Sequence, residues 1–262
     1  MTLPVLTPEL IEAFILVLIR VSSIILMLPV FGDSVIPPQI KWGLSILVAL
    51  LLFPTVKAGM PPLGNTEFLP LILKIAGEIL IGVSIGFTAR CIFAGIQLAG
   101  ELTGMQMGFS MASVIDPSSS TQVSIVAEFQ YMLSLLLFLA VNAHHLFIEA
   151  IAESYGIIGP LTVEHSGALL PVMVRLTQEV FVIAVKISAP IMAVLLFTNV
   201  AMGVMARTVP QMNVFIVSFP LQIAVGFLFL GLTIPIFSQL AQRLFFDLAG
   251  KISLLMRLLQ SG

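Results

Sequence analysis

The sequence predicts an all-α, polytopic membrane protein with about six apolar helices, the last two of which form a C-terminal hairpin. Its 262 residues are 59% hydrophobic and only 9% charged, whereas about a quarter of the residues in soluble domains are charged. Three long intervals contain no charged residue: 129–148, 187–206 and 208–242. A helix needs about 20 apolar residues to cross a bilayer, and a charge at its centre costs roughly 2.5 to 3.5 kcal/mol on insertion scales. The chain is therefore expected to be embedded in a membrane.

The first two helices are expected over about residues 8–28 and 38–53. The first carries Glu9 and Glu12 near its start instead of the basic region of a cleavable signal, so we expect it to be retained. Helix-ending signals follow each of the two helices, namely Pro29 and Gly32-Asp33 after the first and Pro54 and 59–65 after the second.

A third, long helix is expected from about residue 67 to 104, and it contains more charges than a lipid-facing span tolerates: Lys74, Glu78, Arg90 and Glu101. Either these side chains face a protein interior or part of the helix stands clear of the hydrocarbon. Lys74 and Arg90 offer salt-bridge partners to the two glutamates, and a proton relay through the glutamates is the alternative.

Glycines recur at four-residue spacing in and after this helix, at Gly82, Gly86, Gly100, Gly104 and Gly108. Small residues at this spacing let another helix backbone approach closely. We therefore predict that these glycines pack against neighbouring helices. The alternative is that the helix tolerates them and they have no packing role.

The segment 105–122 contains three methionines, one phenylalanine and many small residues. Flexible thioethers repack readily against a surface, so this segment suits a seal against a pore wall or a partner, although an ordinary loop between helices has a similar composition. The residues predicted to form such a plug are Met105, Gln106, Met107, Phe109, Met111, Val114, Ile115 and Asp116.

The second half of the chain predicts helices over about 123–150, over 168–207 and from 214 into the C-terminal tail, with a polar loop around 154–166. The last two helices make a hairpin whose tip contains Arg207, Pro210, Gln211 and Asn213. One arginine at a water interface favours a cytoplasmic tip under the positive-inside rule. Prolines inside membrane helices free carbonyls for neighbouring helices, and this hairpin contains Pro190, Pro220 and Pro235.

No catalytic or metal-binding constellation is found in the sequence. His144-His145 and Glu149 lack the spacing of a zinc helix, and adjacent histidines are expected to point apart. The single cysteine, Cys91, excludes an internal disulfide, and a net charge of −2 offers no footprint for nucleic acid. We expect no enzyme activity, no cofactor and no metal.

The chain resembles the FliR-type flagellar members of the type III secretion export-gate family over essentially its whole length. The first specific motif is Gly-Glu-x3-Met-Gln-Met-Gly-x-Ser at 100–110, followed by Asp116-Pro117. The second lies in the hairpin, at 188–190, 207–215 and 218–220. Arg20 and Ile36-Pro37 add to the resemblance.

This resemblance implies a subunit of the flagellar export gate in the bacterial inner membrane, within the basal body. One copy would join several copies of the larger and the small gate proteins in a helical assembly, and the switch protein would wrap the gate near the hairpin tip. Unfolded flagellar proteins would pass through the centre, which the segment 105–122 would plug at rest. Residues 1–165 would correspond to the larger gate protein and 166–262 to the small one, with lipid as a further partner.

An ion-coupled secondary transporter is the main alternative, with Glu78, Glu101 and Arg90 as a site at the midplane of the membrane. Transporters usually show paired halves with interrupted helices in matching positions, whereas here the charges crowd into the first half. A membrane enzyme is a third and weaker alternative.

Overall fold

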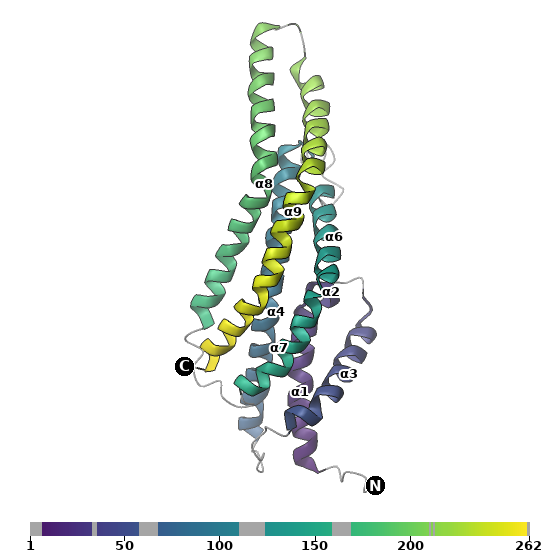
Figure 1. Ribbon diagram of the computed structural model, residues 1–262, viewed down its shortest axis with the longest axis vertical. Coiled ribbons are helices and arrows are strands. Elements are labelled where there is room, and N and C mark those ends of the chain that lie inside the picture. The colour runs from purple at the N-terminus through teal and green to yellow at the C-terminus, as the bar shows by residue number, and fades with distance from the viewer. Residues whose placement is uncertain are drawn as a thin grey trace. The chain divides into compact units, whose positions relative to one another are not determined.

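The computed structural model describes residues 7–32, 36–57, 68–109, 124–158, 169–209, 211 and 213–260, and every regular element in these ranges is a helix (Figure 1). Five helices are long and apolar enough to cross a membrane within the described ranges, and the number becomes six if one bent helix pair counts as a span. The predicted all-α, polytopic membrane fold is confirmed.

The helices follow one another in the order α1 (Pro8–Met27), α2 (Pro29–Gly32), α3 (Pro38–Lys57), α4 (Phe68–Gln106), α6 (Ile125–Ala140), α7 (Ala143–Ile157), α8 (Leu169–Thr208) and α9 (Val214–Gln260). At about 1.5 Å per residue, the 39 residues of α4, the 40 of α8 and the 47 of α9 make each of these helices about 58 Å long or more. This is roughly twice the thickness of the hydrocarbon core of a bilayer.

Two helix boundaries differ from those expected. Pro54 lies inside α3, which continues to Lys57, because one lost backbone hydrogen bond does not end a helix whose apolar residues are packed or in lipid. The helix expected over 123–150 is instead two helices, bent by 64° at a break between Ala140 and Ala143. Asn142 adopts a left-handed backbone conformation there, with φ of 56°, which asparagine tolerates better than most residues.

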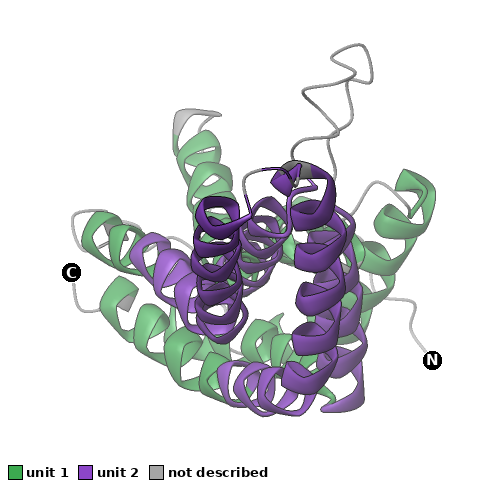
Figure 2. Ribbon diagram, turned by 90° about the horizontal axis from the view of Figure 1, so that it is seen from above, with its two compact units in different colours: residues 1–90, 142–176, 246–262 green, residues 91–141, 177–245 purple. Residues whose placement is uncertain are grey.

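The chain divides into two compact units (Figure 2). Unit 1 comprises residues 1–90, 142–176 and 246–262, and unit 2 comprises residues 91–141 and 177–245. This division follows the packing of the chain, whereas the expected boundary at 165/166 follows a resemblance in sequence and stays a prediction.

Each unit has its own apolar core. In unit 1, α1 buries Leu16, Val17 and Ile24 completely, and the rings of Phe14 and Phe53 meet edge to face at 5.5 Å between α1 and α3. In unit 2 the core contains a group of rings around Phe93, which lies 5.5 to 5.7 Å from the rings of Tyr131, Phe138 and Phe245.

Candidate functional site

The C-terminal end of α4 packs so closely on the start of α6 that two predicted glycines have no room for a side chain. A Cβ at Gly100 would collide with the backbone of Ala127, and one at Gly104 would collide with the hydroxyl of Ser124. Ser124 is also the N-cap of α6, where its Oγ accepts a hydrogen bond from the Ala127 N–H at 3.4 Å. The two glycines therefore bring the cap of α6 against α4.

Helix α4 ends in a Schellman motif. The N–H of Phe109 donates to the carbonyl of Gly104 at 3.1 Å, and the N–H of Gly108 donates to the carbonyl of Met105 at 3.0 Å. This pair of bonds requires a left-handed residue after the helix, and Gly108 has φ of +90°. Gly108 thus ends the helix and sets the direction in which the chain leaves it. A Cβ added to Gly108 would lie 3.0 Å from the ring of Phe219.

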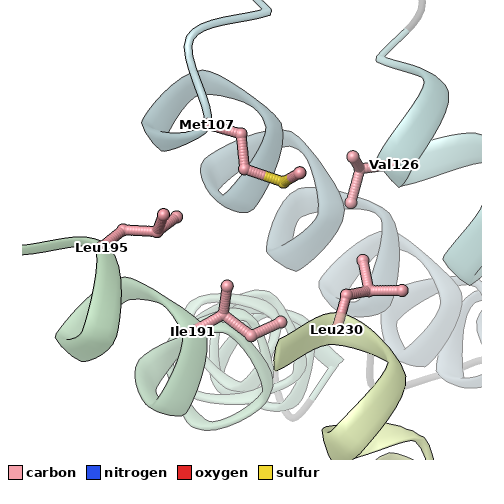
Figure 3. Close-up of a cluster of buried hydrophobic side chains, with 5 residues drawn as sticks. All are labelled: Met107, Val126, Ile191, Leu195 and Leu230. Atoms are coloured by element: carbon pink, nitrogen blue, oxygen red, sulfur yellow. The ribbon is translucent and has the colours of Figure 1, made fainter. Parts of the chain in front are cut away.

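The first residues of the predicted plug are anchored in unit 2. Met107 is fully buried in an apolar cluster, the Met107 cluster, with residues of α6, α8 and α9 (Figure 3): Val126, Ile191, Leu195 and Leu230. Phe109 packs against this cluster, and its ring meets that of Phe227 at 6.1 Å. Met105, by contrast, is 62% exposed. Met111, Val114, Ile115 and Asp116 lie outside the described residues, so the closure of a pore by 105–122 stays a prediction.

A polar link joins the two helices of the hairpin within unit 2. The side-chain amide of Gln222 on α9 donates to the Asn199 Oδ1 on α8, and it lies 2.9 Å from the Ser218 Oγ one turn earlier on α9. Sequence reasoning missed this link, although Asn199 and Gln222 are large amide residues in the middle of uncharged, apolar stretches. Such groups favour partners across a helix pair in a membrane.

Unit 1 contains a buried arginine on α1 that binds two other segments of the chain, α4 and the C-terminal end of α7. Arg20 on α1 is fully buried, and its guanidinium forms a two-pronged ion pair with Glu78 on α4 through the Nε–Oε2 and Nη2–Oε1 contacts. It also donates to the Ser154 Oγ at 3.2 Å and to the Ile158 carbonyl at 3.3 Å. The guanidinium carbon lies 4.0 Å from the centre of the Tyr155 ring. We call these five residues the Arg20 clasp.

The partners of the charges on α4 differ from those expected. Glu78 is paired with Arg20, not with Lys74 or Arg90, because α1 is the helix that packs on this face of α4. Lys74 instead lies 3.3 Å from Glu12 on α1. Glu101 is partly exposed and has no ion pair within the part of the chain that the structure describes.

The predicted glycine packing continues in unit 1, where Gly82 and Gly86 face α1. A Cβ at Gly82 would lie 2.6 Å from the Ser23 Cβ and 2.9 Å from the Arg20 carbonyl oxygen, and one at Gly86 would collide with Met27. The backbone of α4 thus lies directly against α1 beside the Arg20 clasp.

The described residues of the hairpin tip are exposed. Helix α8 ends at Thr208 and α9 begins at Val214, and Arg207, Gln211 and Asn213 all face outward. Pro210 lies outside the described residues. The Asn213 carbonyl accepts from the Ile216 N–H at 3.1 Å and so starts α9. Contact of this tip with another protein stays a prediction.

The two adjacent histidines do not point apart as expected, since their ring centres are 4.3 Å apart. Both lie in the first turn of α7, where His144 is partly buried and His145 is exposed. Among the described residues no group of three or more histidine, cysteine, aspartate or glutamate side chains is arranged to hold a metal ion.

These features define a class of protein: a polytopic, all-α membrane protein whose long helices are held by glycine contacts and by a buried ion pair. The chain belongs to the bacterial export proteins, family 1, whose family model matches residues 11–248.

Several curated relatives are similar to the chain over most of its length. The flagellar biosynthetic protein FliR of Bacillus subtilis is 36% identical over 227 residues, which cover 85% of this chain and 86% of the relative. The FliR protein of Pectobacterium carotovorum is 34% identical over 89% of this chain and 90% of its own length. That of Escherichia coli is 30% identical over 88% of this chain and 87% of its own length.

Proposed function

We propose that this chain is a subunit of the flagellar type III protein export gate and forms part of the channel through which unfolded flagellar proteins cross the bacterial inner membrane. The observation that carries the proposal is the similarity of nearly the whole chain to flagellar FliR proteins, at up to 36% identity among those compared. In this proposal the chain has no enzymatic role, and its partners are the larger and the small gate proteins, the switch protein and the exported proteins.

The lengths of α4, α8 and α9 support this role. Each is roughly twice as long as the hydrocarbon core is thick, so a large part of each helix stands outside the lipid. Helices α8 and α9 also expose large apolar side chains, of which Phe197 and Ile216 are 72% and 70% exposed. Apolar side chains outside the lipid need protein neighbours, as a subunit of a larger assembly would have.

The segment 105–122 is proposed to close the channel at rest. The Schellman motif and the Met107 cluster provide a fixed base for such a plug, because Met107 and Phe109 are held by the chain itself. The flexible thioether and apolar side chains that follow can then repack when a substrate passes.

The transporter alternative is weakened by the Arg20 clasp. A coupling-ion site needs a carboxylate that can exchange its partner, and the carboxylate of Glu78 is already bound through both oxygens by Arg20.

Deletion of the gene in the source bacterium tests the proposed function. We expect cells without flagellar filaments that no longer export hook and filament proteins, and we expect a plasmid copy to restore both. The tagged chain, extracted in mild detergent, should purify together with other membrane subunits of the gate. Normal export in the deletion strain, or a tagged chain that is extracted from these cells without any of those subunits, would contradict the proposal and favour the transporter.

A further inference from the structure

An open apolar groove lies in unit 1 between α1, α3 and α4. Its volume is about 420 Å³, within the range of roughly 300 to 1,000 Å³ that is typical of sites for small molecules. The apolar side chains that line it include Leu18, Leu26, Met27, Trp42, Ile79 and Val83. Trp42 is 51% exposed and Ile79 44% exposed, so the groove is accessible from outside the unit.

The polar side chains in the groove are satisfied within their own helix. Ser22 and Ser23 both line it, and their hydroxyls donate to the Ile19 carbonyl at 3.0 and 2.8 Å. All three helices that form the groove are candidate membrane spans. An occupant therefore needs apolar surface and no hydrogen-bonding groups along most of its length.

Helices α1 and α4 run side by side in the same direction, which places the charges at defined levels along the groove. Glu12 meets Lys74 near the start of both helices, Arg20 meets Glu78 further along, and Met27 meets Arg90 at the end of α1. The 16 residues from Lys74 to Arg90 correspond to about 24 Å of helix, close to the thickness of the hydrocarbon core.

Arg90 lies at one end of the groove as an exposed cation. Its Nη1 is 3.9 Å from the sulfur of Met27, which lines the groove, and no carboxylate pairs with it among the residues that the structure describes. Trp42 and Lys41 mark the same end, because the Lys41 ammonium donates to the Gly32 carbonyl just beyond α1, at 3.0 Å. Tryptophan, lysine and arginine together are typical of the level of the lipid headgroups.

We propose that this groove binds an anionic phospholipid, with one acyl chain along α1 and α4 and the phosphate held by Arg90. A guanidinium binds a phosphate through two parallel hydrogen bonds, and the apolar walls match a hydrocarbon chain. A helix of another protein would also cover the apolar walls, but it would leave Arg90 without a counter-charge unless it carried a carboxylate at that level. This proposal does not rest on the proposed function.

Trp42 is the only tryptophan of the chain, so its fluorescence reports on the groove directly. The full-length protein is reconstituted into vesicles of neutral phosphatidylcholine that contain a small fraction of lipid brominated in the acyl chain. Bromine quenches a tryptophan that it contacts. Since one cationic residue near the surface contributes about 1 kcal/mol toward anionic lipid, we expect brominated phosphatidylglycerol to compete for the groove about fivefold better than brominated phosphatidylcholine.

Arg90→Gln should abolish this preference, so that the two brominated lipids quench Trp42 to the same extent. The matched control is Lys57→Gln, which removes an exposed cation at the other end of α3 and should keep the preference. Equal quenching by the two lipids in the unsubstituted protein, or an unchanged preference in Arg90→Gln, would overturn the proposal.

A second measurement, in living cells, separates lipid from protein as the occupant. A photoreactive amino acid is placed at Val83, in the wall of the groove, and the illuminated protein is analysed by mass spectrometry. An added mass equal to a phospholipid supports the proposal. A crosslink to another polypeptide at this position would show that a protein covers the groove and would overturn it.

Discussion

The Arg20 clasp explains how an arginine can lie in the middle of an apolar helix. Its guanidinium has partners on α4 and α7 as well as an aromatic face, so no donor has to point into lipid. Buried ion pairs of this kind often contribute little net stability compared with apolar residues, yet losing one partner leaves an uncompensated buried charge. The clasp therefore acts mainly by fixing which faces of α1, α4 and α7 meet.

Removing one side of this pair should be far more harmful than removing both. We expect Arg20→Met to destabilise unit 1 by about 3 to 5 kcal/mol, because the Glu78 carboxylate is left buried alone. The double variant Arg20→Met, Glu78→Met should recover much of this loss. Thermal unfolding of the purified protein in detergent measures the effect.

The control for this pair is Lys57→Gln, which removes an exposed cation at the end of α3, since surface substitutions usually change stability by no more than about 0.5 kcal/mol. Additive effects of the two clasp substitutions would contradict the pairing.

A substitution at Gly104 tests the contact between α4 and α6. Gly104→Leu should reduce the yield of folded protein strongly, because its side chain would collide with Ser124 at the cap of α6, and overpacking typically costs about 1 to 3 kcal/mol. Gly203→Leu is the matched control, since a Cβ at Gly203 meets nothing within 4 Å. A normal yield of both variants, measured by size-exclusion chromatography in detergent, would show that the α4–α6 contact is not needed.

The sequence predicts which residues need partners better than it predicts the partners. The charges on α4 and the glycine spacing were both evident. Gly82, Gly86 and Gly100 lie against backbone atoms of a neighbouring helix, and Gly104 lies against the side chain of Ser124. The choice of Arg20 for Glu78 could not be predicted, because the two residues are 58 positions apart and Lys74 and Arg90 are nearer in sequence. Only the packing of α1 on α4 decides between them.

The presence of each long helix could be predicted from the sequence, whereas the residues at which the helices end were harder to predict. Pro54 looked like a terminator because in water a helix rarely continues past an interior proline, and α3 continues for three residues. The break between α6 and α7 had a signal that was missed, namely Asn142 within an otherwise apolar run. No sequence signal indicated that each unit is built from separate stretches of the chain, since this depends on contacts between segments far apart in the sequence.

The end of α4 suggests a cleaner test of the plug than removing the whole loop. Replacing residues 111–117 with a glycine-serine linker of equal length keeps Gly108, Phe109 and the Met107 cluster, so we expect the gate complex to assemble at nearly normal yield. The apolar seal would be gone, and the conductance of the inner membrane to small ions should rise several-fold in cells that overproduce the gate. Unchanged conductance in a complex of normal yield would mean that 105–122 does not close the pore.

The hairpin of α8 and α9 is the part of the chain that the proposed assembly brings to the switch protein. Its helices are linked to each other by the hydrogen bond between Asn199 and Gln222, which lies about two helical turns from the tip. In the proposed assembly this tip lies at the cytoplasmic entrance, where an exposed polar surface is available to the switch protein.

Reversing the charge at the tip with Arg207→Glu tests that contact. Arg207 is exposed, and its guanidinium can form forked bonds with a carboxylate or with helix-end carbonyls of a partner. Because it makes no ion pair within the described residues, the variant should fold and assemble normally, while export and swimming speed fall several-fold. Arg207→Lys, which keeps the charge and loses the fork, should have an intermediate effect.

A photoreactive residue at position 211 should crosslink to the switch protein in the unsubstituted background. If Arg207→Glu cells swim normally and position 211 yields no crosslink, the tip is a solvated turn that serves only to join two helices.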